Sequence, residues 1–104
     1  MAHKPSVVHV STLAPRACGI ANFTRDLALA LEHSRLVARN AFVAVEEDGV
    51  SREYDSKPVC IVWQNNESSY QEAARLLNRT GFEVMHLEHE YGIYGGDWGE
   101  YVLD

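Results

Sequence analysis

A histidine and a glutamate, His89 and Glu90, stand at the end of an apolar run with the composition of a strand. Directly after them comes the glycine-rich stretch Tyr91-Gly92-Ile93-Tyr94-Gly95-Gly96. An imidazole can hydrogen-bond a ligand, and closely spaced glycines let the backbone approach one. Open α/β sheets bind ligands in a crevice at the carboxyl ends of their strands. The stretch therefore predicts a binding site in which His89 faces the ligand; the alternative is a hydrogen-bonded histidine at a strand end without a ligand.

A second junction of this kind lies near residue 16. The β-rich run 7–12 passes through a turn at Pro15 into a helix that starts near Gly19. Gly19 lets the backbone approach a ligand, and the first N–H groups of a helix have no partner within it. Their partial positive charge, with Arg16 as an added cation, suits a bound anion. The alternative is a tight strand-to-helix turn without a ligand.

The other reactive side chains have simpler interpretations. Zinc needs about four converging ligands, whereas His86 and His89 in a strand-like run project to opposite faces, so we expect no metal site. His9 lies in a predicted buried strand and is expected to be a hydrogen-bonded core histidine. A thiol such as Cys18 at a helix start can have a lowered pKa, but no paired base accompanies it, so nucleophilic catalysis is not expected.

Strands and helices are expected to alternate along the chain. The strand-like runs are 7–12, 41–45, 59–63 and 82–87. The first helix follows from apolar residues at helical spacing, which are Ile20, Phe23, Leu27, Ala30 and Leu31. The second is indicated by the capping-box pair Ser69 and Glu72 and by an apolar face, and Gly81 is expected to end it. Residues 46–58 are expected to form a loop, or alternatively a hairpin around Asp48-Gly49.

A third helix is predicted to start at Asp97, and the sequence stops at Asp104, barely two turns later. A helix this short is marginal on its own. We therefore expect residues 1–104 to be the N-terminal part of a longer polypeptide. The order of elements predicts an α/β fold with a mostly parallel, Rossmann-like sheet, in which Gly19 and His89 share one crevice.

Composition limits the classes of function. The chain has 104 residues and a net charge of −6, without the Lys and Arg clusters that nucleic-acid binding relies on. Its two cysteines are far apart and have no secretory context, so we expect reduced thiols in a cytoplasmic protein. No apolar run approaches the length of a membrane span. A peripheral association with the inner face of a membrane is compatible with these features.

Two stretches in this order resemble a known family. The segments STLAPRACGIANFTRDL, which starts at Ser11, and HEYGIYGG, which starts at His89, look like the N-terminal part of bacterial group 1 glycosyltransferases. These are the retaining family 4 enzymes of GT-B fold, which place two Rossmann-like domains across a cleft. The resemblance spans nearly the whole chain.

The resemblance implies the transfer of a sugar from a nucleotide-sugar donor to a carbohydrate or lipid-linked acceptor, without a metal or another cofactor. It makes residues 1–104 the acceptor-side domain, with the donor-binding domain absent. Gly19, with Arg16 beside it, matches the loop that approaches the donor diphosphate, and His89 matches the histidine near the transferred sugar.

On the acceptor side, the resemblance implies roles for Gly95 and Gly96, which match the loop that follows the histidine. Glu90 would orient His89 or cap a turn. Tyr91 and Tyr94 would stack on a sugar or be buried.

Two alternatives accompany this interpretation. The chain could be a stand-alone carbohydrate-binding or protein-interaction module without catalysis. It could also be a nucleotide-binding domain of another class, although it lacks both GxGxxG and a P-loop. As an incomplete sheet, the isolated chain would expose apolar surface and the unpaired edge of its last strand, so we expect it to form a homo-oligomer.

Overall fold

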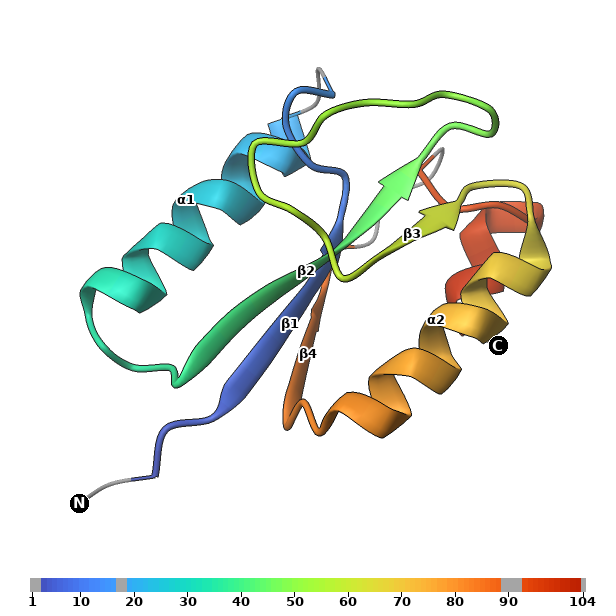
Figure 1. Cartoon of the computed structure of the whole chain (residues 1–104). Coiled ribbons are helices and arrows are strands. Elements are labelled where there is room, and N and C mark those ends of the chain that lie inside the picture. The colour runs from blue at the N-terminus through green and yellow to red at the C-terminus, as the bar shows by residue number, and fades with distance from the viewer. Residues whose placement is uncertain (1–2, 17–18, 89–92, 104) are drawn as a thin grey trace.

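A single sheet of four parallel strands forms the centre of the molecule (Figure 1). The computed structural model describes residues 3–16, 19–88 and 93–103. The strands are β1 (Ser6–Ser11), β2 (Arg39–Glu46), β3 (Cys60–Trp63) and β4 (Val84–Leu87). Their order in the sheet is β3-β2-β1-β4, and every neighbouring pair is parallel. The predicted α/β fold class with a parallel, Rossmann-like sheet is confirmed.

The helices lie on both faces of this sheet. Helix α1 (Gly19–His33) covers one face, and α2 (Glu67–Thr80) lies on the other together with the short 3₁₀ helix η1 (Asp97–Leu103) (Figure 1). The side chains of β1 and of the second half of β2 are buried, as expected for strands covered on both sides. Val8 and Val43 belong to a core that also includes Ile93 and Tyr94.

Helix α1 buries mainly small side chains, and only part of its predicted apolar series is covered. Its buried side chains are the small residues Ala21, Thr24 and Ala28, whereas Phe23 is 57% exposed. Small side chains let the helix approach the sheet closely, which leaves no room for a phenylalanine in the contact. Phe23 and Ala30, which belong to the apolar series that indicated the helix, are exposed.

Helix α2 begins before the predicted capping box. Its N-cap is Asn66, so Ser69 lies inside the first turn. The Ser69 hydroxyl accepts a hydrogen bond from the backbone N–H of Trp63 at 2.9 Å and lies 2.6 Å from the backbone oxygen of Asn66. Ser69 thus joins β3 to α2 instead of capping the helix. Gly81 ends the helix with a φ of 74°, in the left-handed region that was predicted.

The connection between β2 and β3 is a loop of residues 47–59, which runs past the start of α1 (Figure 1). The hairpin alternative is wrong, because these residues contain no strand. A turn at Gly49 starts the loop, and the backbone N–H of Asp55 donates to the backbone oxygen of Ala14 at 3.2 Å. The connection is therefore tied to the loop that precedes α1.

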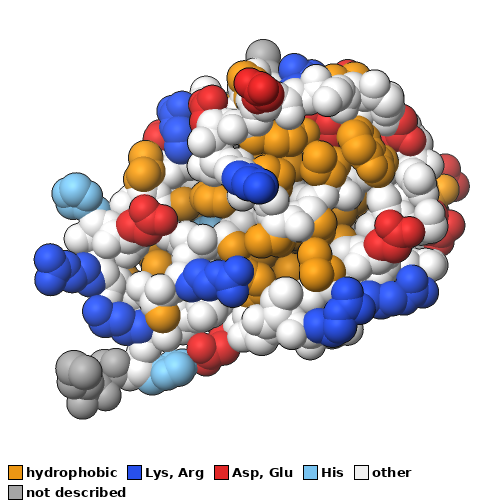
Figure 2. Space-filling view, viewed as in Figure 1, with side chains coloured by type: hydrophobic (Ala, Val, Ile, Leu, Met, Phe, Trp, Pro, Cys, Tyr) orange, Lys and Arg blue, Asp and Glu red, His pale blue; other side chains and the backbone are white. Residues whose placement is uncertain are grey.

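One face of the molecule carries both apolar and charged groups. Figure 2 shows hydrophobic side chains gathered over the middle of this face, with Lys, Arg, Asp and Glu around them. A shallow groove along β3 is lined by apolar residues such as Ile61 and Trp63 and by the cations Arg52 and Lys57.

Among the described residues, no helix is long and apolar enough to cross a membrane.

Candidate functional site

The carboxyl ends of β1 and β4 lie side by side. Val10 pairs with Leu87, and the backbone N–H of Glu88 donates to the backbone oxygen of Val10 at 3.1 Å. Because α1 follows β1 directly, this is the edge of the sheet at which a crevice was expected. The predicted residues His89, Glu90 and Tyr91 lie outside the described residues.

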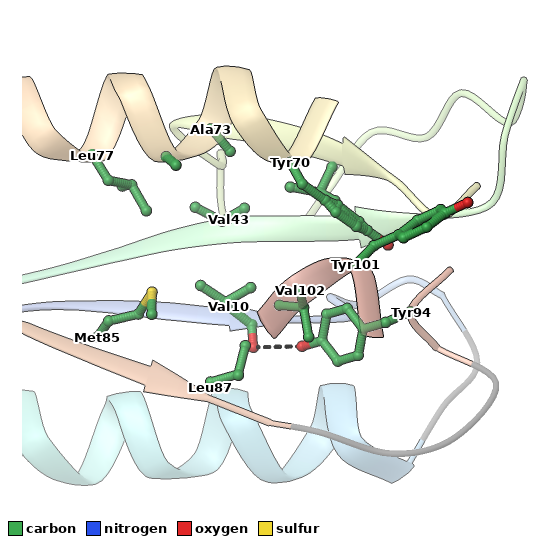
Figure 3. Close-up of a pocket in the computed structure, with 12 residues that line it drawn as sticks. Val10, Val43, Tyr70, Ala73, Leu77, Met85, Leu87, Tyr94, Tyr101 and Val102 are labelled. Atoms are coloured by element: carbon green, nitrogen blue, oxygen red, sulfur yellow. Dashed lines mark hydrogen bonds between the residues drawn. The ribbon is translucent and has the colours of Figure 1, made fainter. Parts of the chain in front are cut away.

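Tyr94 contacts the carboxyl ends of both β1 and β4. Its side chain is buried, and its hydroxyl contacts the backbone oxygens of Val10, at 3.3 Å, and of Glu88 (Figure 3). Glu88 and Tyr94 are thus both held beside the carboxyl end of β1. Of the two interpretations of Tyr94, stacking on a sugar or burial, the structure shows burial.

Gly19 is the first residue of α1, and it is exposed. A Cβ atom added at Gly19 would meet nothing within 4 Å, and its φ is not in the left-handed region. Neither packing nor backbone conformation therefore requires a glycine at this position. The space beside the first turn of α1 is open, which leaves room for a ligand to approach the helix N-terminus.

Arg16 bonds to the end of β2. Its guanidinium donates to the backbone oxygen of Val45 at 3.0 Å and lies 4.0 Å from a carboxylate oxygen of Glu46 and 3.6 Å from one of Glu47. Only 13% of the Arg16 side chain is exposed. These contacts hold the loop before α1 against β2, and a contact of Arg16 with a diphosphate stays a prediction.

Glu46 is a fully buried carboxylate at the end of β2. It accepts hydrogen bonds from Tyr54 at 2.7 Å, from Arg52 at 2.8 Å and from the backbone N–H of Glu47 at 2.9 Å. Burial by itself raises the pKa of this carboxyl, but these hydrogen bonds and the charge of Arg52 outweigh burial and lower the pKa. Burial and the neighbouring Glu46 raise the pKa of Tyr54.

The sequence interpretation missed Glu46 because it placed the residue in a loop. The available signal was the acidic run Glu46-Glu47-Asp48, which directly follows the apolar residues 41–45. A dinucleotide-binding fold uses an acidic residue in this region to bind ribose hydroxyls. Here the carboxylate is occupied by Arg52, Tyr54 and the backbone of Glu47, so it has a structural role.

Gly95 and Gly96 are glycines for reasons of packing. A Cβ atom on Gly95 would lie 2.0 Å from the backbone oxygen of Gln64, and one on Gly96 would lie 2.7 Å from the Tyr101 ring. Gly96 also has a φ of +84°, which favours glycine. The Tyr70 hydroxyl accepts a hydrogen bond from the backbone N–H of Gly95 at 2.9 Å and donates one to the backbone oxygen of Gln64 at 2.7 Å. An additional role in acceptor binding stays a prediction.

A chain of hydroxyl groups lies at the carboxyl end of β1. The Thr24 hydroxyl donates to the Ser11 hydroxyl at 2.9 Å, and Ser11 donates to the backbone oxygen of Thr12 at 2.9 Å. The Thr12 hydroxyl is also buried, and it has no hydrogen-bond partner among the described residues. A buried hydroxyl without a partner costs free energy, and a polar ligand or a water molecule would supply that partner.

A cavity of about 210 Å³ opens between α2 and the strands β1 and β4 (Figure 3). Leu77 lines it from the helix, Met85 and Leu87 line it from β4, and Tyr94 and Val102 close one end. The lining is mostly apolar, and Met85 is 58% exposed. This cavity lies on the α2 side of the sheet, so it is separate from the start of α1.

The described part of the chain contains no group of three or more His, Cys, Asp or Glu residues that could hold a metal ion. The fold and the adjacent ends of β1 and β4 define an α/β protein with a Rossmann-like sheet. Comparisons of the chain with protein families, curated proteins and solved structures give no match.

Proposed function

We propose that this chain is the acceptor-side domain of a glycosyltransferase that moves a sugar from a nucleotide-sugar donor to a carbohydrate or lipid-linked acceptor. The observation that carries this proposal is the pairing of β1 with β4. The two stretches that resemble the glycosyltransferase family follow these two strands. The parallel pairing places the carboxyl ends of the strands that precede the two stretches side by side, as a shared site requires.

The start of α1 is suited to the leaving group of such a reaction. A departing nucleoside diphosphate gains negative charge, which unpaired N–H groups at a helix N-terminus stabilise. The open space at Gly19 would allow a diphosphate to approach, and the unpaired hydroxyl of Thr12 offers a further polar contact at the end of β1. His89 would hydrogen-bond the transferred sugar.

The test is sugar transfer by the natural polypeptide that carries this sequence, assayed with a panel of nucleotide sugars. A Cβ atom at Gly19 meets no other atom within 4 Å, so we expect Gly19→Leu to fold and its kcat/KM to fall at least about tenfold. Asn22→Leu is the matched control, because Asn22 is exposed one turn further along α1. Equal turnover by the Gly19 variant and the control would contradict the proposal.

A second candidate is a non-catalytic interaction module, which the apolar cavity beside α2 favours. Such a module would bind a carbohydrate or a protein and would neither hydrolyse nor transfer a nucleotide sugar. The intact mass of the natural polypeptide helps to separate the candidates. A product that ends at Asp104 favours the module or a two-chain enzyme, and a product of several hundred residues favours the transferase.

A further inference from the structure

Two histidines on neighbouring strands face each other on the α1 side of the sheet. The Nδ1 atom of His9 in β1 lies 3.0 Å from the Nδ1 atom of His86 in β4, and the two rings meet edge to face. His9 is fully buried, whereas the side chain of His86 is 28% exposed. The contact joins the two strands whose carboxyl ends border the candidate site.

The outer nitrogen atoms of both rings have partners that fix their protons. The Asn40 amide nitrogen donates to the backbone oxygen of Ala28 at 2.9 Å, so its oxygen accepts from the Nε2 atom of His9, also at 2.9 Å. The Nε2 atom of His86 lies 2.8 Å from a carboxylate oxygen of Glu88. An ionised carboxylate can only accept. Both Nε2 atoms therefore carry hydrogen.

The contact between the two Nδ1 atoms therefore accommodates only one proton. If neither Nδ1 atom carried hydrogen, their lone pairs would repel each other. If both carried hydrogen, two positively charged rings would direct N–H groups at each other. One proton between the Nδ1 atoms makes a hydrogen bond and leaves a single positive charge on the histidine pair. We propose that His9 and His86 form a pH-sensitive latch between β1 and β4, closed only in this singly charged state, with the charge on His86.

The surroundings place the charge on His86. Glu88 contacts His86 directly, whereas His9 is enclosed by the Asn40 amide and the Phe42 ring, which stacks on it with centroids 5.4 Å apart. Burial, followed by the charge of His86, lowers the pKa of His9, although Asn40 and Glu88 raise it in part. The buried side chains that α1 contributes are uncharged; they are Ala21, Thr24 and Ala28. The charged groups acting on His9 are thus His86 and Glu88.

Opening the latch would release the residue that leads into the candidate site. The Glu88 side chain is held by His86, and its backbone is held by Val10 and Tyr94. Acid adds a second proton to the histidine pair, and alkali removes the only one, so either change breaks a hydrogen bond. The latch is therefore expected to be closed in a pH window with a limit on each side.

The first experiment uses the whole chain and determines the protonation of each imidazole by nitrogen-15 NMR at pH 6. We expect His9 to carry hydrogen on Nε2 alone and His86 to carry hydrogen on both nitrogen atoms. A doubly protonated His9, or a His86 with one bare nitrogen, would overturn the proposal. This measurement needs no variant, so it does not depend on the folding of an altered protein.

The second experiment measures amide hydrogen exchange of Glu88 from pH 5 to pH 9, after correction for the intrinsic rate. We expect protection to fall about tenfold on both sides of the window, which corresponds to a coupling of one pKa unit. His86→Gln should remove this pH dependence, and His33→Gln, at an exposed site at the end of α1, should retain it. The same pH profile in His86→Gln and in the wild type would contradict a latch.

Discussion

The hydroxyl of Tyr54 lies 2.7 Å from the buried Oε2 atom of Glu46, which also accepts a hydrogen bond from Arg52. Tyr54 and Arg52 both belong to the connection 47–59, which has no helix or strand of its own. One carboxylate at the end of β2 therefore holds an irregular segment against the sheet. The stability of this segment should depend on the charge of that carboxylate.

Replacing Glu46 with Gln should destabilise the protein by about 2–3 kcal/mol. Removing one partner of a buried ion pair typically costs about 3–5 kcal/mol, and the partial exposure of Arg52 reduces this cost. Urea unfolding measures the change. Glu47→Gln is the control, because the Glu47 side chain is 55% exposed and its loss should cost less than about 0.5 kcal/mol. Equal losses in the two variants would contradict the role of Glu46.

The contribution of Glu46 should also disappear in acid. Its folded-state pKa lies below the ordinary value of 4.5, so the unfolded chain takes up a proton at a higher pH than the folded protein does. The stabilisation is complete above pH 4.5 and is lost as the pH falls through the folded-state pKa. Urea unfolding from pH 7 to pH 3 should show a steeper loss in the wild type than in Glu46→Gln. His9 titrates in both proteins, so the difference between them isolates Glu46.

Two glycines should respond in opposite ways to alanine. Gly95→Ala would place a Cβ atom 2.0 Å from a backbone oxygen, and we expect a loss of about 2–4 kcal/mol. Gly19→Ala meets open space at the start of a helix and should be neutral or stabilising by up to about 1 kcal/mol. Thermal unfolding compares the two variants. A stable Gly95→Ala protein would show that the loop is not packed against Gln64.

Tyr94→Phe should loosen the end of β4 while keeping the core filled. The lost hydroxyl leaves the backbone oxygen of Glu88 without this donor, which typically costs about 1–2 kcal/mol. We expect faster hydrogen exchange at Glu88 and unchanged exchange at Val45 in β2. Uniform acceleration across both strands would indicate a global effect instead of a local anchor.

The expected self-association of the isolated chain can be tested at Met85. This residue is 58% exposed on the edge strand β4 and lines the apolar cavity beside α2. Met85→Glu should shift the mass measured by light scattering towards the monomer, because a charge opposes the burial of this surface. Leu36→Glu is the control, since Leu36 is similarly exposed but follows α1. A monomeric wild type at high concentration would remove this prediction.

The strands and the helix end at Gly81 could be predicted from the sequence because their signals are local. Valine-rich runs mark strands that are buried on both faces, and a glycine after a helical run supplies the left-handed residue. The position of Ser69 was misjudged for a physical reason. Its hydroxyl bonds the end of β3, and this tertiary contact competes with the local capping pattern.

The polar contacts around the candidate site depend on strand register. The rings of His9 and His86 are in contact although 77 residues separate them in the sequence, and no sequence spacing predicts this contact. Glu46 finds its partners in an irregular loop, where no periodicity identifies Arg52 or Tyr54. The adjacency of the carboxyl ends of β1 and β4 was predictable from topology, but the contacts of Arg16 with the end of β2 were not.

The central position of β1 sets the order in which the fold can assemble during synthesis on the ribosome. This strand is the first of the four to be translated, and its two neighbours in the sheet are β2 and β4. One edge of β1 can pair only after β2 has been translated. The backbone groups on its other edge stay unpaired until β4 has been translated. The edge that borders the candidate site is thus the last to close, and a trailing nascent chain or a chaperone has the longest access to it.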